Sequence, residues 1–93
     1  MTSIDIDCRP AAEGWTCTVR LADENRGSTN HEVTVSTADF ARLAPGAHDP
    51  SALVRRSFAF LLEHEPKESV LRRFDLAVIS RYFPDYEAEI RGD

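Results

Sequence analysis

Two cysteines and one of the three histidines are the side chains whose types could support covalent chemistry. Cys8, Cys17 and His31 fall on the apolar side of alternating segments, so we expect them on the inward face of a small sheet. An imidazole beside a thiol could withdraw its proton and create a nucleophile, and the three groups together could hold a metal. No CxxC, HxxxH or HxxE spacing accompanies them. We therefore favour core packing over a thiol-dependent enzyme or a metal site.

Other catalytic signatures are missing from the sequence. There is no GxGxxG, Walker A or GxSxG motif, which are the patterns of nucleotide-binding and hydrolase sites. The acidic pairs Asp5/Asp7 and Asp23/Glu24 are most simply solvated strand and loop charges, because paired carboxylates need a cleft that shifts their pKa values before they do acid–base work. We expect a protein that is not an enzyme and that uses no cofactor or metal.

Basic residues gather in the later part of an otherwise acidic chain. Residues 51–83 contain six basic and four acidic side chains, whereas residues 1–50 contain four basic and eight acidic ones. The basic groups include Arg72 and Arg73 and alternate with aromatic residues, a composition that could contact phosphates and stack on bases. Acidic neighbours in the same stretch favour surface ion pairs instead, and the segment lacks the three- to four-residue turn of a helix-turn-helix. A nucleic-acid-associated regulator is therefore the alternative hypothesis.

Length and composition indicate a single globular domain, residues 1–93. Apolar residues make up 42% and charged residues 29%, and the net charge is −5. A chain this short has a thin core, which favours self-association or partner binding. No apolar run approaches the length of a membrane span, and the first residues lack the basic start and apolar stretch of a secretory signal. We expect cytoplasmic residence with both thiols reduced.

Three segments alternate polar and apolar side chains with the period of a β-strand. They are residues 3–8, 15–21 and 31–36. Turn residues at 9–14 and a polar loop at 22–30 separate them. We predict a three-stranded antiparallel meander with one face toward solvent.

The remainder of the chain carries helix start and stop signals. The expected helices are residues 38–44, 50–64, 67–74, 76–83 and 85–90. The strongest start is Asp49-Pro50, an N-cap followed by proline at the first helical position. Apolar residues of 50–64 fill one broad arc, so this main helix should cover the sheet. The sequence therefore predicts an α+β domain in which short C-terminal helices follow the main helix.

The segment LRRFDLAVISRYFPDYE (71–87), preceded by SFAFLLE (57–63), resembles a family of short uncharacterised bacterial proteins. That resemblance implies no activity and no catalytic residues. A meander followed by a helix is also similar to the layout of HicB-like antitoxins, which bind a small toxin and sometimes DNA. The turn and helix-start signature of those antitoxins is not visible in this chain.

The preferred hypothesis is a small non-enzymatic interaction or regulatory protein that acts through its C-terminal helical surface. Aromatic residues and arginines are the side chains that most often dominate protein interfaces. The candidate surface consists of Phe60, Arg72, Arg73, Arg81, Tyr82, Phe83 and Tyr86. We expect the partner to be a second copy or another protein, and we expect no membrane insertion.

Overall fold

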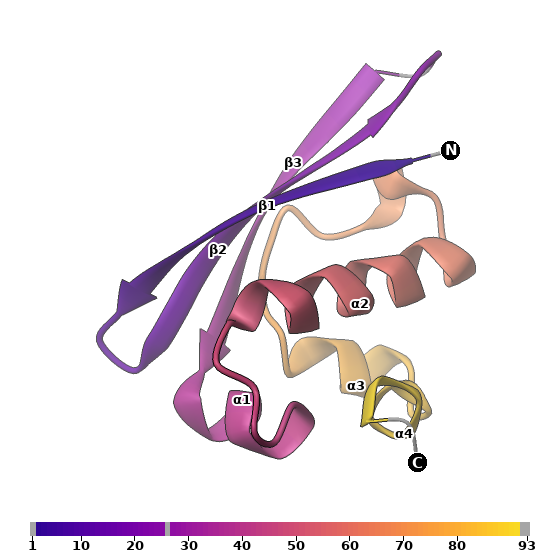
Figure 1. Cartoon of the computed structure of the whole chain (residues 1–93). Coiled ribbons are helices and arrows are strands. Elements are labelled where there is room, and N and C mark those ends of the chain that lie inside the picture. The colour runs from indigo at the N-terminus through magenta and orange to yellow at the C-terminus, as the bar shows by residue number, and fades with distance from the viewer. Residues whose placement is uncertain (1, 26, 92–93) are drawn as a thin grey trace.

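The computed structural model describes residues 2–25 and 27–91, which form one four-stranded sheet with helices on one of its faces (Figure 1). The elements are β1 (Ser3–Ala11), β2 (Gly14–Asp23), β3 (Gly27–Ser36), α1 (Thr37–Leu43), α2 (Pro50–His64), the 3-10 helix η1 (Lys67–Ser69), β4 (Arg73–Asp75), α3 (Val78–Tyr82) and α4 (Tyr86–Arg91). The predicted α+β class is confirmed. None of the helices in these ranges has the length and apolar character needed to cross a membrane.

The first three strands form the predicted antiparallel meander, but they are longer than expected. Pairing runs continuously from Ser3↔Ala22 to Ala11↔Gly14, so the turn expected at 9–14 shrinks to its tip. A side chain at Gly14 would place its Cβ 1.9 Å from the Val35 carbonyl oxygen, which explains why a glycine allows the strands to approach there. The loop expected at 22–30 is shorter than predicted as well, because β2 and β3 stay paired as far as Asp23↔Gly27.

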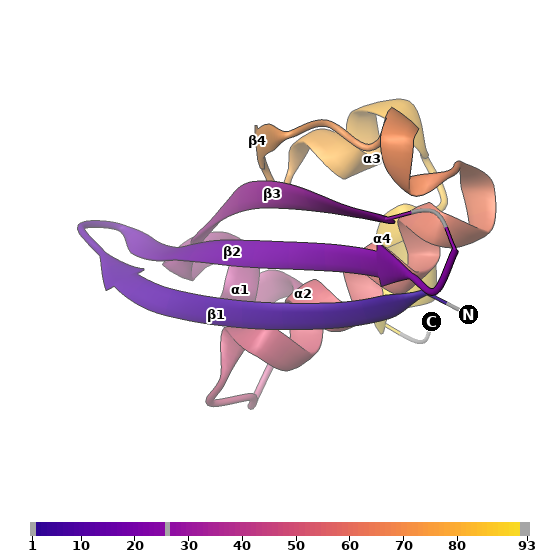
Figure 2. The ribbon, with the colours of Figure 1, turned by 90° about the horizontal axis from the view of Figure 1, so that it is seen from above.

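A fourth strand replaces the helix expected at residues 67–74, and that prediction is wrong. η1 makes one turn, and β4 then pairs in parallel with β3, with Phe74 opposite Val33 (Figure 2). The open edge of β3 supplies the backbone partners: the Glu32 amide donates to the Arg72 carbonyl at 2.8 Å. A short helix without a capping side chain is marginal by itself, so these sheet bonds decide the conformation.

The helix starts follow the capping signals. The Asp49 carboxylate accepts from the Ser51 amide at 3.0 Å, and α2 spans the predicted 50–64. Ser36 caps α1 by accepting from the Asp39 amide at 3.0 Å. The last two helices lie close to the predicted 76–83 and 85–90, although α3 is three residues shorter than expected.

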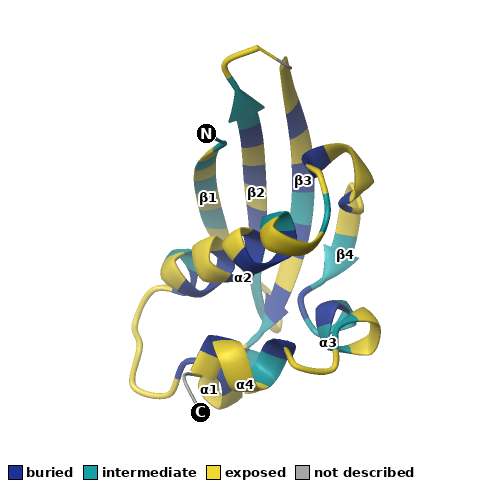
Figure 3. Ribbon diagram, turned by 90° about the vertical axis from the view of Figure 1, so that its right-hand side faces the viewer, coloured by how far each residue is buried: buried dark blue, intermediate teal, exposed yellow. Residues whose placement is uncertain are grey.

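The core lies between the sheet and α2, whose buried side faces the strands (Figure 3). The strand side chains that point inward and are buried include Cys17, Val19, Leu21, Val33 and Val35, and the buried side chains of α2 include Leu53, Val54, Phe58 and Leu61. The opposite face of the sheet is polar, as the alternation predicts. The C-terminal helix α4 packs against α2 and α1, and α3 packs against α4 and β4. Both leave part of their surface to solvent.

Candidate functional site

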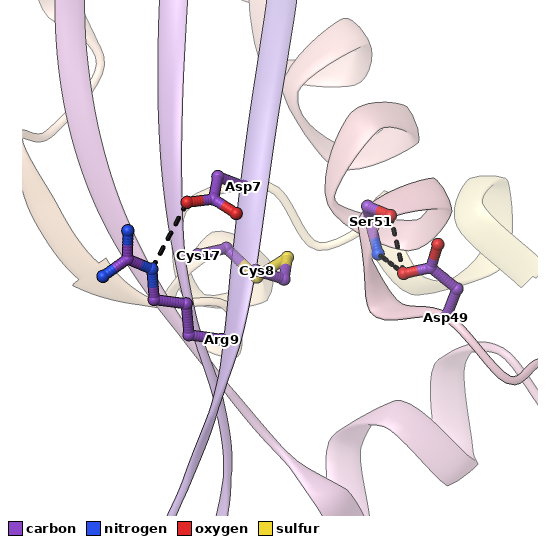
Figure 4. Close-up of a disulfide and its surroundings, with 6 residues drawn as sticks. All are labelled: Asp7, Cys8, Arg9, Cys17, Asp49 and Ser51. Carbon is purple, nitrogen blue, oxygen red and sulfur yellow. Dashed lines mark hydrogen bonds and ion pairs between the residues drawn. A yellow bond between two sulfur atoms is a disulfide. The ribbon is translucent and has the colours of Figure 1, made fainter.

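The two cysteines form a disulfide with each other, so the expectation of two reduced thiols is wrong for this structure. Cys8 and Cys17 stand directly opposite one another on β1 and β2 (Figure 4). Cys17 is fully buried, whereas Cys8 is partly exposed on the edge strand. Both sulfur atoms are occupied by this bond, so neither can act as the nucleophile of a thiol-dependent enzyme.

His31 is a satisfied core side chain rather than a base. Its Nδ1 lies 2.7 Å from the Leu71 carbonyl and must donate, because a carbonyl oxygen only accepts. Its Nε2 then accepts from the Thr29 hydroxyl at 2.8 Å. Burial lowers the pKa of His31 below its ordinary value. The neutral ring therefore ties the segment before β4 to β3.

No metal centre emerges from the described part of the chain. Within residues 2–25 and 27–91, no three His, Cys, Asp or Glu side chains are grouped closely enough to hold a metal ion. His31, the histidine that sequence reasoning placed with the cysteines, instead pairs with β2 at Val19, two residues beyond Cys17.

An apolar pocket lies in the C-terminal region. It has a volume of about 420 Å³ and lies between the end of α2, the segment from η1 to β4, and α3. We call it the C-terminal pocket. Its lining consists of Leu61, Glu65, Ser69, Val70, Leu71, Phe74, Val78, Ile79, Tyr82 and Phe83.

The walls of this pocket include the most exposed large apolar side chains among the described residues. Leu71 is 49% exposed and Tyr82 is 68% exposed. Glu65 is the single charged residue of the lining. An apolar hollow with large apolar side chains left at its mouth is typical of a binding site, because exposed apolar area is stabilised when a partner covers it.

In the structure the predicted interaction surface divides into three parts: one at the C-terminal pocket, one on the sheet, and one buried in the core. Tyr82 and Phe83 line the C-terminal pocket, and Arg81 is exposed beside them on α3. Arg72 and Arg73 instead border a shallow depression that also includes Thr18, on the polar side of the sheet. The basic residues of the nucleic-acid hypothesis are therefore divided, because Arg73 begins β4, with Arg72 directly before it, whereas Arg81 lies on α3. That hypothesis stays a prediction.

Arg73 is also engaged within the chain. Its Nε lies 3.3 Å from the Glu32 carboxylate, across the β3–β4 pair. This is a surface ion pair, but its acidic partner lies on β3 and not among the acidic neighbours of residues 51–83 that the sequence suggested. Such exposed pairs contribute little to stability.

Phe60 and Tyr86 are buried, and their assignment to the surface is wrong. The Phe60 ring packs against Phe83 and Tyr86 at centroid distances of 5.7 and 5.4 Å. The Tyr86 hydroxyl donates to Ser57 at 2.6 Å, and Ser57 donates to the Leu53 carbonyl. Burial raises the pKa of Tyr86 to about 12. Both rings therefore belong to the packing between α2 and the C-terminal helices.

Sequence reasoning missed Leu71 as a site residue. The sequence places Leu71 inside an expected helix, whereas in the structure it belongs to the extended chain before β4 and lines the pocket. One signal in the sequence disfavours a helix start here: Pro66 occupies the N-cap position and has no side chain that can accept a capping hydrogen bond.

Comparison with known proteins gives no family assignment: no family model, no curated protein and no solved structure matches the chain. The resemblance of residues 71–87 to short bacterial proteins and the likeness to HicB-like antitoxins therefore stay predictions. The geometry of the C-terminal pocket is what supports a function.

Proposed function

We propose that this chain is a small non-enzymatic protein-binding module whose partner inserts apolar side chains into the C-terminal pocket. One observation supports this most directly. Leu71 and Tyr82, the most exposed large apolar side chains of the described residues, belong to the same pocket. Two such side chains scattered over the surface would need no explanation, but their convergence on one hollow does.

The size and lining of the pocket suit side chains of a protein. Its volume of about 420 Å³ lies in the usual range of binding pockets, about 300–1,000 Å³. Covering apolar surface stabilises a complex by roughly 25 cal/mol per Å². Aromatic anchors such as Tyr82 are the residues that carry most binding energy in interfaces.

Binding suits these walls better than catalysis. The lining supplies one carboxylate, from Glu65, and hydroxyls from Ser69 and Tyr82, with no histidine, cysteine or lysine. A catalytic nucleophile is usually activated by a neighbouring base, and this lining contains no histidine, cysteine or lysine for such a pair. The pocket therefore offers recognition of apolar groups with one charge to orient them.

The sequence and the disulfide point to different cellular compartments, and an experiment can separate them. The sequence predicts the cytoplasm, whereas a disulfide such as Cys8–Cys17 is typical of oxidising compartments. Trapping the thiols with an alkylating reagent during cell lysis and counting the labels by mass spectrometry separates the two. Two labels support the cytoplasm, and none supports an oxidising compartment.

Site-specific photo-cross-linking in the producing cells tests the binding function. A photoreactive phenylalanine at position 82 should give one dominant cross-linked product, formed either with another protein or with a second copy of this chain. The product should disappear when Leu71→Asp is added. The matched control places the same probe at Ala59, which is exposed on α2 outside the pocket.

The proposal is wrong if position 82 gives no more product than position 59. Circular dichroism of the purified Leu71→Asp chain shows whether it is folded. Because Leu71 is half exposed, we expect the folded spectrum to persist.

A further inference from the structure

We infer that the occupant of the C-terminal pocket is a second copy of this chain, related to the first by a two-fold axis. This inference rests on the proposed function and names its partner. A two-fold dimer uses the same patch on both subunits, so the patch must complement itself. The C-terminal pocket meets this requirement in shape and in charge.

The shape requirement is a hollow and a protrusion on one face. The pocket supplies the hollow, and Leu71 and Tyr82 supply the protrusions at its mouth. When two such faces meet, the protruding side chains of each copy can enter the hollow of the other. A foreign partner would have to provide both features itself, whereas a second copy already has them.

The charge requirement is a pair of opposite charges at the same face, one in the pocket lining and one beside it. Glu65 lies at the end of α2, and Arg81 lies on α3, three residues after the pocket residue Val78 and therefore beside it on the helix surface. Neither side chain makes an ion pair with the described residues 2–25 and 27–91. A two-fold axis through the pocket mouth brings Glu65 of each copy toward Arg81 of the other.

A second surface that could support self-association, the open edge of β1, is protected. Arg55 donates to the Ile4 carbonyl at 2.7 Å, and Pro10 offers no backbone N–H for pairing. Charged residues also stand along this strand. The C-terminal pocket is therefore the better site for a second copy.

Charge reversal tests the dimer by sedimentation equilibrium over a range of concentrations. We expect the wild-type chain to dimerise. In the Glu65→Arg dimer, the new arginine of each copy lies opposite Arg81 of the other copy. In the Arg81→Glu dimer, the new glutamate of each copy lies opposite Glu65 of the other copy. Each single variant should dissociate about tenfold more readily, because two weak ion pairs become repulsive.

A mixture of the two variants provides the decisive arm. In a heterodimer of Glu65→Arg with Arg81→Glu, both contacts again join opposite charges, so the equimolar mixture should recover wild-type association. Neither position is buried in the core, and circular dichroism checks that each variant is folded. Control charge reversal at Glu63, exposed on α2 and outside the pocket lining, should leave association unchanged.

A wild-type chain that stays monomeric at all concentrations overturns the inference, and so does a mixture that associates no better than its components. The cross-linking result separates this failure from that of the proposed function. A monomer that still cross-links through position 82 to a different protein retains the binding function with another partner. A monomer without such a product refutes both.

Discussion

Two neighbouring stretches with similar helical expectations fold differently. α2, residues Pro50–His64, is a helix with the predicted bounds, whereas the linker segment, residues 66–75, contains a single 3-10 turn and a short strand. The first has Asp49 as a capping side chain and an apolar face that covers the sheet. The second begins at Pro66, which has no side-chain cap.

The linker segment is instead held by groups from the sheet. Lys67 is buried, and its Nζ lies 3.0 Å from the Asp23 carboxylate at the end of β2. His31 donates to the Leu71 carbonyl, and the Glu32 amide donates to the Arg72 carbonyl. Local sequence thus determines α2, and tertiary contacts determine the linker segment. The two regions should respond to different substitutions.

The largest expected effect is the removal of an α2 core side chain. Phe58 is fully buried, with its ring 5.7 Å from that of His31 and 5.9 Å from that of Phe74. Phe58→Ala should lower the free energy of unfolding by about 3–5 kcal/mol, through lost burial and the cavity left behind. Leu71→Ala in the linker segment should cost about 1 kcal/mol or less. Urea unfolding measures both, and equal losses would contradict the contrast.

The disulfide comes next, and it acts on the edge of the sheet away from the linker segment. Replacing Cys8 and Cys17 together by Ala removes a cross-link that closes a short loop, and should cost about 2–3 kcal/mol. Thermal and urea unfolding measure the loss. Amide exchange of residues 66–75, relative to α2, should not change. Selective loosening of that segment would show that β1 also supports it.

The sequence indicates α2 and the meander because their signals are local. Asp49-Pro50 marks a helix start, and the alternation of Cys17, Val19 and Leu21 marks a strand with one buried face. These patterns need no knowledge of the partner element. The ends of strands are harder to predict, because the same polar residues occur at a hairpin tip whether they belong to a strand or to a loop.

The linker segment and the disulfide could not be derived in this way. β4 exists because β3 has an open edge 41 residues earlier, as the pairing of Val33 with Phe74 shows. The Cys8–Cys17 bond depends on a register that places the two residues opposite each other, and alternation alone does not fix register. Tyr82 of the candidate surface lines the C-terminal pocket, whereas Leu71 is absent from the predicted surface because the conformation of the linker segment is non-local.

His31 tethers the linker segment to β3 through the Leu71 carbonyl, and removing this tether should loosen the linker segment selectively. His31→Leu leaves the Leu71 carbonyl and the Thr29 hydroxyl without their partner, at a cost of about 2 kcal/mol. Hydrogen exchange should accelerate at residues 70–74 more than within α2. Uniform acceleration over both regions would mean that the tether serves the whole core rather than the linker segment.

The helix caps should give a smaller effect that is confined to α2 and α1. Asp49→Ala removes the acceptor for the Ser51 amide and should cost about 1 kcal/mol. Ser36→Ala at the start of α1 removes an equivalent bond and serves as the comparison. Circular dichroism and urea unfolding measure both. Faster amide exchange in the linker segment of the Asp49→Ala chain would contradict the contrast, because it would mean that the cap of α2 also stabilises the linker segment.

The smallest effect should be a pH dependence that originates from the tether itself. Burial lowers the pKa of His31 below its ordinary value of 6.5, so in the intervening pH range the unfolded chain binds more protons than the folded one. The stabilisation is complete above pH 6.5 and is lost as the pH falls through the folded-state pKa. Unfolding of wild type and His31→Leu, compared at about pH 7.5 and about pH 5, isolates this group, because all other titrations are shared. The stability of wild type should fall more between these two pH values than that of His31→Leu. Equal falls would mean that His31 is protonated equally easily in both states, and would remove burial as the cause of its neutral form.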